Sequence, residues 1–358
     1  MLKPRAAVHN VKAYHPPLGD RQGLRMDFNE NTVGCSPRVL QCLQKISGEQ
    51  LARYPERAPV ETVVAAHLEI RPEELLLTNG TDEAIHLVCE TYLEPGTEAL
   101  IVVPTYSMYE IYAAATGAKV VSIPAGEDFC FPVDQVLARI NEHTRLIAIA
   151  NPNNPTGVLL PASDVPRIAE AAPQAAVLID EAYFEFCGET VLPAFRQLPN
   201  IFVSRTFSKV YGLAGLRIGV LMGNSEQMRL VRRFGSPYSV NSVALACLPE
   251  ALADQGYIQQ YVDEVLKGRQ RLEQELLSAG IKYWPSRANF VLLRIGERSP
   301  GFVSGMRARG ILVRDRSSDH GCAGCVRITL GSNEDNTRLL TVLAEVLSEI
   351  GLGEKAKA

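Results

Sequence analysis

Two stretches decide the fold: Leu146-Ile-Ala-Ile-Ala-Asn-Pro-Asn-Asn-Pro-Thr-Gly157 and Ala175-Ala-Val-Leu-Ile-Asp-Glu-Ala-Tyr183. Each begins with a short apolar run, typical of a buried strand, and continues into polar and turn-forming residues. The same pattern predicts further strands at Ala99–Val103, Ile201–Ser204 and Ile218–Met222. Helical patterns separate them, at Asp82–Leu93, Ser107–Gly117, Pro132–Asn141 and Ala162–Ala171. This alternation predicts an α/β fold with a mostly parallel sheet covered by helices on both faces.

The pattern changes after about residue 240. A long charged helix is predicted over Gly256–Ala279, followed by strands at Ala288–Ile295, Ile311–Arg314 and Cys325–Leu330 and a helix at Asn333–Glu349. We therefore expect a large domain over residues 46–240 and a smaller α+β domain over residues 241–358. The first 45 residues are expected to form an arm that packs with the small domain.

The composition is that of an ordinary globular protein, with 46% hydrophobic and 21% charged residues in a chain of 358. A formal charge of −4 gives no reason to expect nucleic acid or an acidic membrane surface. No apolar run reaches the ~18 residues needed to span a bilayer, and the start lacks the apolar core of a secretory signal. We expect a cytoplasmic enzyme that binds small molecules.

The eight cysteines are scattered, so a disulfide scaffold is not expected. Cys322 and Cys325 have the CxxC spacing of a zinc or redox site, but no second pair or histidine cluster accompanies them. We interpret them as small, half-buried residues of a turn before a strand, and we expect no metal.

The polar residues that follow the predicted strands are the candidates for chemistry, because ligands bind at the carboxyl ends of strands in open α/β sheets. Within Ser204–Gly219 a strand is followed by hydroxyls, by Lys209 and, eight residues later, by Arg217. A lysine shielded from full solvation is a nucleophile for carbonyl chemistry. Ser208 and Arg217 suit an anionic phosphate. A surface lysine on an irregular loop is the alternative interpretation.

The sequence Thr78-Asn-Gly-Thr-Asp-Glu83 ends a strand and opens a helix. Free backbone N–H groups at such a helix start can bind phosphate, Gly80 allows close approach, and Thr81 adds a hydroxyl. Simple capping of the helix by Thr81 or Asp82 is the alternative.

Three other segments could hold a planar cofactor. Asn151–Gly157 is a stiff turn that could fix an amide, although most such turns are only turns. Asp180 ends a strand and could pair with a pyridinium nitrogen, with the phenol of Tyr183 three residues on. Tyr106, within Pro104–Ser107, could lay an aromatic face on a ring.

Together these segments resemble the fold-type I aminotransferases, which use pyridoxal 5′-phosphate (PLP), in their order and spacing along nearly the whole chain. The most similar branch is histidinol-phosphate aminotransferase. That resemblance rests on Phe28–Asn31, Arg53-Tyr-Pro55, the NGTDE and RTFSK motifs, and Val326–Gly331. Thr32 departs from the branch, in which proline commonly follows Asn-Glu-Asn; this concerns the arm rather than the cofactor.

The resemblance implies roles for individual residues. Lys209 would form the Schiff base with PLP and then act as the base, Asp180 would pair with the pyridine nitrogen, and Tyr183 would hydrogen-bond the ring oxygen. The implied cofactor-binding residues are Tyr54, Gly80, Thr81, Asp82, Tyr106, Asn154, Asp180, Tyr183, Thr206, Ser208, Lys209 and Arg217. Tyr54 would reach the cofactor of a second subunit, which implies a homodimer with shared sites.

The resemblance also implies a substrate-binding set of Tyr14, Asn31, Arg314 and Arg327. Arg327 would bind a carboxylate, and Arg314 the substrate's phosphate, although an ordinary surface ion pair remains the alternative for Arg314. The implied reaction exchanges an amino group between histidinol phosphate and 2-oxoglutarate/glutamate.

Other functions remain open from sequence. An aromatic amino-acid aminotransferase or a threonine-phosphate decarboxylase would use the same cofactor residues. A nicotinamide-dependent oxidoreductase fits poorly because no GxGxxG follows an early strand. A non-catalytic PLP-binding regulator would need a DNA-binding segment that the sequence lacks.

Overall fold

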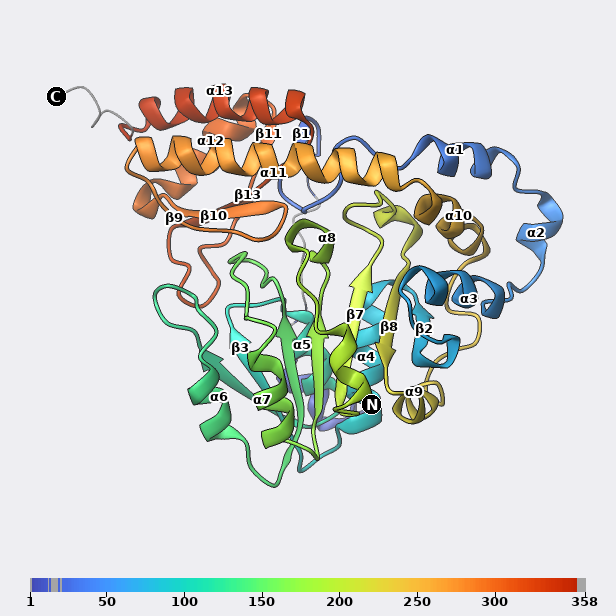
Figure 1. Cartoon of the computed structure of the whole chain (residues 1–358). Helices are drawn as coiled ribbons and strands as arrows, with labels where there is room; N and C mark the ends of the chain where they lie inside the picture. The colour runs from blue at the N-terminus through green and yellow to red at the C-terminus, as the bar shows by residue number, and fades with distance from the viewer. Residues whose placement is uncertain (1, 12, 14–18, 20, 353–358) are drawn as a thin grey trace.

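The computed structural model describes residues 2–11, 13, 19 and 21–352. Its centre is a seven-stranded sheet (Figure 1). In spatial order the strands are β2 (Leu75–Thr78), β8 (Gly219–Gly223), β7 (Ile201–Thr206), β6 (Ala176–Asp180), β5 (Thr144–Ala150), β3 (Glu98–Val103) and β4 (Lys119–Pro124). Neighbours from β7 to β4 pair in parallel, whereas β8 is antiparallel to both β7 and β2.

Helices cover both faces of this sheet, as the alternating pattern predicts. One face packs on α4 (Gly80–Tyr92), α5 (Met108–Ala115) and α9 (Ser225–Val231). The other packs on α3 (Ala58–His67), α6 (Val133–Arg139), α7 (Asp164–Ala171) and α8 (Phe184–Cys187). Figure 1 shows α6 and α7 in front of the sheet and α4 and α5 behind it.

A second, antiparallel sheet has the order β12 (Arg314–Asp315), β13 (Cys325–Thr329), β10 (Phe290–Arg294) and β9 (Lys282–Trp284). We call it the small sheet. It is covered by α11 (Gln255–Ser278), α12 (Ser299–Ala308) and α13 (Asn333–Glu349), of which α11 and α13 lie side by side in Figure 1. The strand β1 (Leu24–Arg25) pairs in parallel with β11 (Ile311–Leu312).

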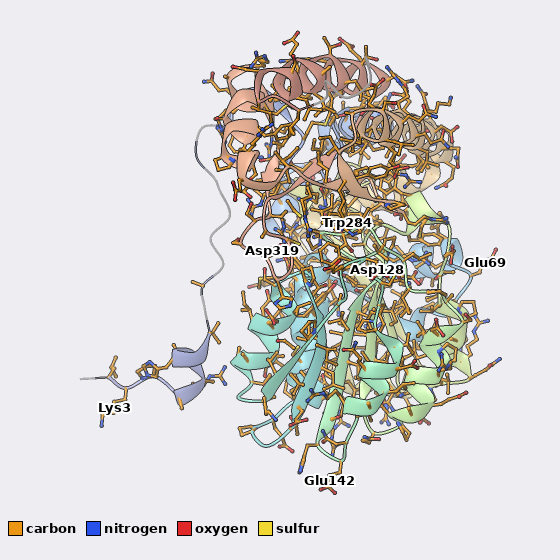
Figure 2. All side chains as sticks on the ribbon, turned by 90° about the vertical axis from the view of Figure 1, so that its left-hand side faces the viewer. Lys3, Glu69, Asp128, Glu142, Trp284 and Asp319 are labelled. Carbon is orange, nitrogen blue, oxygen red and sulfur yellow. The ribbon has the colours of Figure 1, made fainter. Side chains whose placement is uncertain are left out.

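The remaining elements are short, apart from α10. They are α1 (Pro37–Gln44), α2 (Gly48–Ala52), α10 (Ser242–Ala253) and the 3₁₀ turns η1 (Ala6–Asn10), η2 (Pro72–Glu74), η3 (Leu192–Arg196), η4 (Ala214–Leu216) and η5 (Gly296–Arg298). Figure 2 shows Lys3 at the outer end of the first of these turns, away from the body of the molecule. In the described part of the chain, no helix combines the length and apolarity needed to cross a membrane.

The α/β fold class is confirmed, and the predicted helices and strands agree with the structure to within a few residues. The single strand predicted at Ile311–Arg314 is wrong. The chain there forms β11 and β12, which pair with β1 and β13 respectively, so Val313 separates two strands of different sheets. The prediction also missed β4 and β9, because β4 is half exposed and β9 has only three residues.

Strand alternation sets which side chains reach the candidate site. Successive side chains of a strand point to opposite faces. Ala176 and Leu178 pack in the cluster under α4 and α5, so Asp180 lies on that same face of β6. On β7, Phe202 packs in that cluster, which places Ser204 and Thr206 on the face of Asp180. Asp180 and Ser204 are direct partners across the two strands.

Gly219 begins β8 between the ends of β2 and β7, where it faces Thr78 and Thr206. A Cβ atom built at this position would lie 2.9 Å from the backbone of both Gly80 and Thr81. The first turn of α4 therefore packs directly on the backbone of β8, which only glycine allows.

We predict that Gly219→Ala lowers the free energy of unfolding by about 1–3 kcal/mol, the typical effect of an atom inserted into a packed site. Urea denaturation measures it. Gly215→Ala is the matched control, because a Cβ there meets no atom within 4 Å. Equal effects of the two substitutions would contradict the close packing of α4 on β8.

Candidate active site

A cavity of about 300 Å³ opens at the carboxyl ends of β5, β6 and β7. Ten of the predicted cofactor-binding residues line it: Thr81, Asp82, Tyr106, Asn154, Asp180, Tyr183, Thr206, Ser208, Lys209 and Arg217. Phe28 and Glu30 line it as well. Residues from six distant segments thus meet at one end of the sheet, where ligands bind in open α/β folds.

Lys209 follows β7 and reaches into the cavity. Its Nζ donates a hydrogen bond to the carbonyl oxygen of Phe28 at 3.1 Å. Burial lowers the pKa of Lys209 to about 8, and the positive charge of Arg327 acts in the same direction. The charged form still predominates at neutral pH, but more of this amine is uncharged than in an exposed lysine, which favours its use as a nucleophile.

Asp180 is 5% exposed and holds two hydrogen bonds that the sequence did not reveal. Tyr109 Oη donates to its Oδ2 at 2.7 Å, and Ser204 Oγ donates to its Oδ1 at 3.0 Å. Burial raises the pKa of Asp180 to about 6, while these two hydrogen bonds favour the charged form. The carboxylate is thus held in one orientation at the cavity wall.

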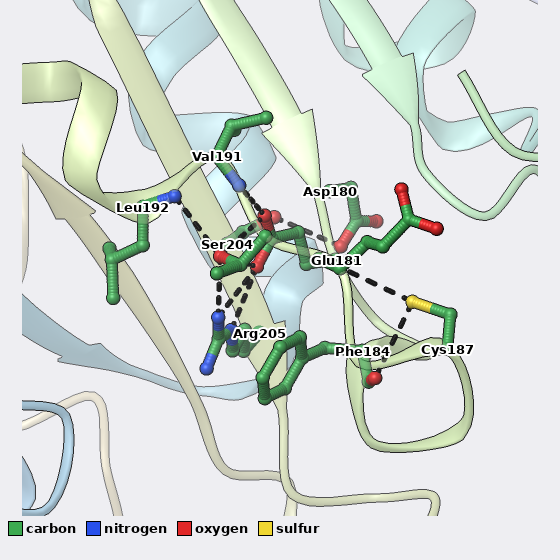
Figure 3. Close-up of polar contacts among 10 residues, drawn as sticks. Asp180, Glu181, Phe184, Cys187, Val191, Leu192, Ser204 and Arg205 are labelled. Atoms are coloured by element: carbon green, nitrogen blue, oxygen red, sulfur yellow. Dashed lines mark hydrogen bonds and ion pairs between the residues drawn. The ribbon is translucent and has the colours of Figure 1, made fainter. Parts of the chain in front are cut away.

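The next residue, Glu181, forms a buried ion pair with Arg205 (Figure 3). Glu181 Oε2 accepts hydrogen bonds from Arg205 Nε at 2.9 Å and Nη2 at 2.8 Å. The hydroxyl of Thr190 and the backbone N–H of Val191 also donate to this carboxylate. The Arg205 guanidinium lies 3.5 Å from the centre of the Phe184 ring. These contacts join the ends of β6 and β7, the strands that present Asp180 and Thr206.

The opposite end of the cavity suits an anion. The helix α4 begins there, and the Asn79 side chain does not cap it. Arg217 has a left-handed φ of 53° and places Nη2 2.9 Å from Asp82 Oδ2. Gly80 has a left-handed φ of 72°, which favours glycine, and a Cβ there would lie 2.7 Å from that same Nη2.

Hydroxyl groups complete this end of the cavity. Thr206 Oγ1 donates to Ser208 Oγ at 2.9 Å, and Tyr106 Oη donates to Asp82 Oδ1 at 2.8 Å. Helix start, guanidinium and hydroxyls together form a phosphate-binding arrangement.

Asn154 and Tyr183 line the cavity between these ends. Arg327 Nη1 donates to Asn154 Oδ1 at 2.5 Å, and a guanidinium has no acceptor atoms. Asn154 Oδ1 therefore faces Arg327, and its Nδ2 donor faces elsewhere. Asn29 Nδ2 donates to Tyr183 Oη at 2.9 Å, a contact that the sequence gave no signal for beyond the Phe28–Asn31 motif.

Several predicted residues lie outside the cavity lining. Tyr54 is 79% exposed and stacks on Tyr238, with ring centres 4.5 Å apart. Asn31 donates to the Val210 carbonyl and accepts from two backbone N–H groups, so it fixes a turn. Tyr14 lies outside the described residues.

The two predicted substrate arginines are neighbours across β12 and β13, where Arg314 pairs with Arg327 in register. The guanidinium carbon of Arg314 is 5.6 Å from the centre of the Phe28 ring. Arg314 also lines a separate hollow of about 500 Å³ with Arg316 and His320.

Cys322 lies in the turn before β13, as predicted, whereas Cys325 is the first residue of β13 itself, and both are fully buried rather than half-buried. They belong to a small apolar cluster with Trp284, which Figure 2 labels close to the boundary between the layers of the two sheets. Among the described residues, no group of three or more His, Cys, Asp or Glu side chains is placed to hold a metal ion.

Comparison with known proteins agrees with this geometry. The family model "Aminotransferase class I and II" matches residues 21–343. The chain belongs to this family of PLP-dependent aminotransferases. A curated histidinol-phosphate aminotransferase from a Geobacillus species is 33% identical over 354 residues, which is 97% of this chain and 95% of the relative.

Solved structures confirm the fold of this aminotransferase. The structure of histidinol-phosphate aminotransferase from Sinorhizobium meliloti with pyridoxal-5′-phosphate has a TM-score of 0.87 at 24% identity, covering 98% of this chain and 99% of that one. L-threonine-O-3-phosphate decarboxylase from Porphyromonas gingivalis has a TM-score of 0.77 at 23% identity, covering 91% and 99%. At these identities the likeness concerns the fold alone.

The residues of the cavity fit PLP. Its volume lies at the lower end of the range for small-ligand sites. A lysine with a lowered pKa suits the cofactor's aldehyde, a buried carboxylate suits its pyridinium nitrogen, and the α4 start with Arg217 suits its phosphate.

The raised pKa of Asp180 gives a prediction for the cofactor-free protein. The pKa of this carboxyl rises from 3.8 in the unfolded chain to about 6 in the folded protein. The folded protein therefore loses stability as the pH increases from about 3.8 to about 6, and the whole loss is present above pH 6. Asp180→Asn should therefore stabilise the cofactor-free protein by on the order of 2 kcal/mol at pH 8 and far less at pH 4.5. Urea denaturation at the two pH values measures this.

Asp134→Asn is the control for this experiment, because the Asp134 side chain is 94% exposed. A gain from Asp180→Asn that is equal at both pH values would show that the buried charge of Asp180 is not the cause.

Proposed function

We propose that this aminotransferase transfers the amino group of L-histidinol phosphate to 2-oxoglutarate, giving imidazole-acetol phosphate and glutamate in histidine biosynthesis. The observation that carries the proposal is the match along nearly the whole chain to relatives with that activity in their name. The position of Arg314 supports it, since its guanidinium lies 5.6 Å from the ring of Phe28, a residue that lines the cavity.

The roles of the residues follow from their chemistry. When bound, PLP supplies the electron sink for reaction at the carbon next to the substrate's nitrogen. Lys209 would hold the cofactor and would serve as the base that moves a proton from the substrate carbon. Asp180 would keep the pyridine nitrogen protonated, because its buried negative charge favours a cation beside it. Tyr183 and Asn154 would donate hydrogen bonds to the ring oxygen, and Tyr106 would stack on the ring.

The two arginines serve the two substrates. Histidinol phosphate carries a phosphate and no carboxylate, whereas 2-oxoglutarate carries two carboxylates. A site for both needs one cation near the reacting carbon and one farther out. Arg327, next to Asn154, takes the near position, and Arg314 takes the far one.

Parallel assays with histidinol phosphate, phenylalanine and threonine phosphate test this function. We expect turnover of histidinol phosphate far above phenylalanine and no release of carbon dioxide from threonine phosphate. Preference for phenylalanine would indicate an aromatic aminotransferase instead, and release of carbon dioxide a decarboxylase.

Arg314→Ala should lower kcat/KM for histidinol phosphate about 10- to 150-fold, the effect of losing a charge-assisted contact of roughly 1.5–3 kcal/mol. Phenylalanine should be affected far less because it has no distal anion. Arg314→Lys should also lower kcat/KM for histidinol phosphate, because a lysine ammonium group cannot make the two parallel hydrogen bonds of a guanidinium. Arg309→Ala, which removes ion pairs between α12 and α13, is the control. Equal losses on both substrates would contradict the phosphate role of Arg314.

We also propose that the enzyme is a cytoplasmic homodimer with shared sites. Tyr54 lies outside the cavity of its own chain, and the ring of Tyr54 stacks on Tyr238 with both rings exposed, as expected of aromatic residues at an interface. Among the exposed large hydrophobic side chains of the described residues, Leu51 and Phe234 are the nearest to these two in sequence. The division into an arm (1–45), a large domain (46–240) and a small domain (241–358) is part of the same proposal.

Mixed dimers test the shared site. Lys209→Ala removes the Schiff-base lysine and should abolish activity and visible absorbance, and Tyr54→Phe should strongly impair its neighbour's site. In a heterodimer of the two, one site carries both changes and the other carries neither, so activity should return. No recovery, with heterodimers shown to form by differently tagged chains, would mean that Tyr54 does not act across the interface.

A further inference from the structure

Asn29 is a buried asparagine that the proposed reaction leaves without a role. It is 1% exposed and has a left-handed φ of 55°, a conformation that asparagine tolerates better than most residues. The main-chain carbonyl oxygen of Asn29 accepts a hydrogen bond from Asn289 Nδ2 at 3.2 Å. Its backbone and its side chain are both engaged, so its position is closely fixed.

Thr329, on β13 of the small sheet, sets the orientation of the Asn29 amide. The backbone N–H of Asn29 donates to Thr329 Oγ1 at 3.1 Å, and the Thr329 hydroxyl donates in turn to Asn29 Oδ1 at 3.0 Å. In the flipped amide orientation, this hydroxyl proton would lose its acceptor. Oδ1 therefore faces Thr329 and Nδ2 faces Tyr183.

This orientation determines what the Tyr183 hydroxyl can do. Tyr183 Oη accepts the hydrogen bond from Asn29 Nδ2 at 2.9 Å, so its single proton is left for another acceptor. Tyr183 is 4% exposed, and burial raises its pKa, so the hydroxyl keeps its proton at neutral pH. The ring itself is held edge-on by Phe290 at 5.1 Å between centres.

We propose that Asn29 and Thr329 are positioning residues that turn the Tyr183 hydroxyl into a hydrogen-bond donor aimed into the cavity. The inference rests on the proposed function in one respect, namely that the anionic acceptor there is the ring oxygen of PLP. Because Thr329 lies on the small sheet, correct docking of that sheet supplies the donor that the cofactor meets. Neither residue touches the reacting atoms.

The test is the pH dependence of the visible absorbance of the substrate-free holoenzyme. The colour changes when the proton shared between the Lys209 nitrogen and the ring oxygen is lost. A hydrogen bond to the ring oxygen stabilises the proton-free form, so loss of that bond raises the midpoint. Tyr183→Phe should raise it by about 1–2 pH units, the equivalent of one hydrogen bond to a charged group.

Asn29→Asp reverses the hydrogen bond, because a carboxylate oxygen replaces Nδ2 and takes the Tyr183 proton. We expect a rise comparable to that of Tyr183→Phe. In the Tyr183→Phe background, Asn29→Asp should add little. Thr329→Val, which removes the hydroxyl that orients the amide, should raise the midpoint by a smaller amount, and Thr329→Ser should keep the wild-type value.

Thr144→Val is the matched control, since it removes a fully buried threonine hydroxyl at the far end of β5. Its midpoint should stay at the wild-type value. The proposal is overturned if Tyr183→Phe or Thr329→Val leaves the midpoint unchanged. It is also overturned if Asn29→Asp raises the midpoint equally with and without the Tyr183 hydroxyl, because its charge would then act directly. Since no substrate is present, failure to turn over histidinol phosphate would not alter this result.

Discussion

The burial of two consecutive carboxylates at the end of β6 is the constraint on which the rest of the site depends. Asp180 and Glu181 are 5% and 1% exposed, and an uncompensated buried charge costs several kcal/mol. Glu181 is fully compensated within the protein by Arg205, Thr190 and Val191. Asp180 has only neutral donors, Tyr109 and Ser204, so its charge remains available to a cation in the cavity. The two adjacent residues of this motif therefore differ in one respect: the charge of Glu181 is neutralised within the protein, and the charge of Asp180 is not.

The pKa directions agree with this division. Burial raises the pKa of Asp180 and lowers the pKa of Lys209. In the cofactor-free protein, burial therefore disfavours the charged form of both groups. A pyridinium nitrogen would bring the partner charge that Asp180 lacks, whereas Arg217 already pairs with Asp82 and a phosphate would add a second anion beside it. The cavity is therefore electrostatically incomplete by itself, and cofactor binding would stabilise the fold through linkage.

The sequence predicted the fold and most of the residues that line the cavity, because their signals are local. Asp180, Lys209 and the Gly80–Asp82 turn each follow an apolar strand directly, and strand alternation then fixes the face on which Asp180 lies. The supporting residues gave no such signal. Tyr109 reads as an ordinary helix residue, and its partner Asp180 is 71 positions away. Asn29 and Thr329 are separated by 300 positions, so only the packing of the small sheet brings them together. Asn31 is also an asparagine and lies two positions after Asn29, yet the side-chain amide of Asn31 fixes a local turn.

The same comparison explains why donor orientation is harder to predict than residue position. A sequence motif shows that an amide or a hydroxyl is present, but the neighbouring residues in the fold determine where its hydrogen-bond donors and acceptors point. Here Arg327 and Thr329, two residues apart on one face of β13, govern Asn154 and Tyr183 respectively, the second through Asn29. One strand of the small sheet therefore sets the hydrogen-bonding character of both groups expected at the ring oxygen. The small sheet contributes substrate-binding arginines in the proposed function, and its strand β13 also decides whether the large sheet's cavity presents donors. This dependence couples the chemistry of the cavity to the packing of the two sheets, without any residue of β13 lining the cavity.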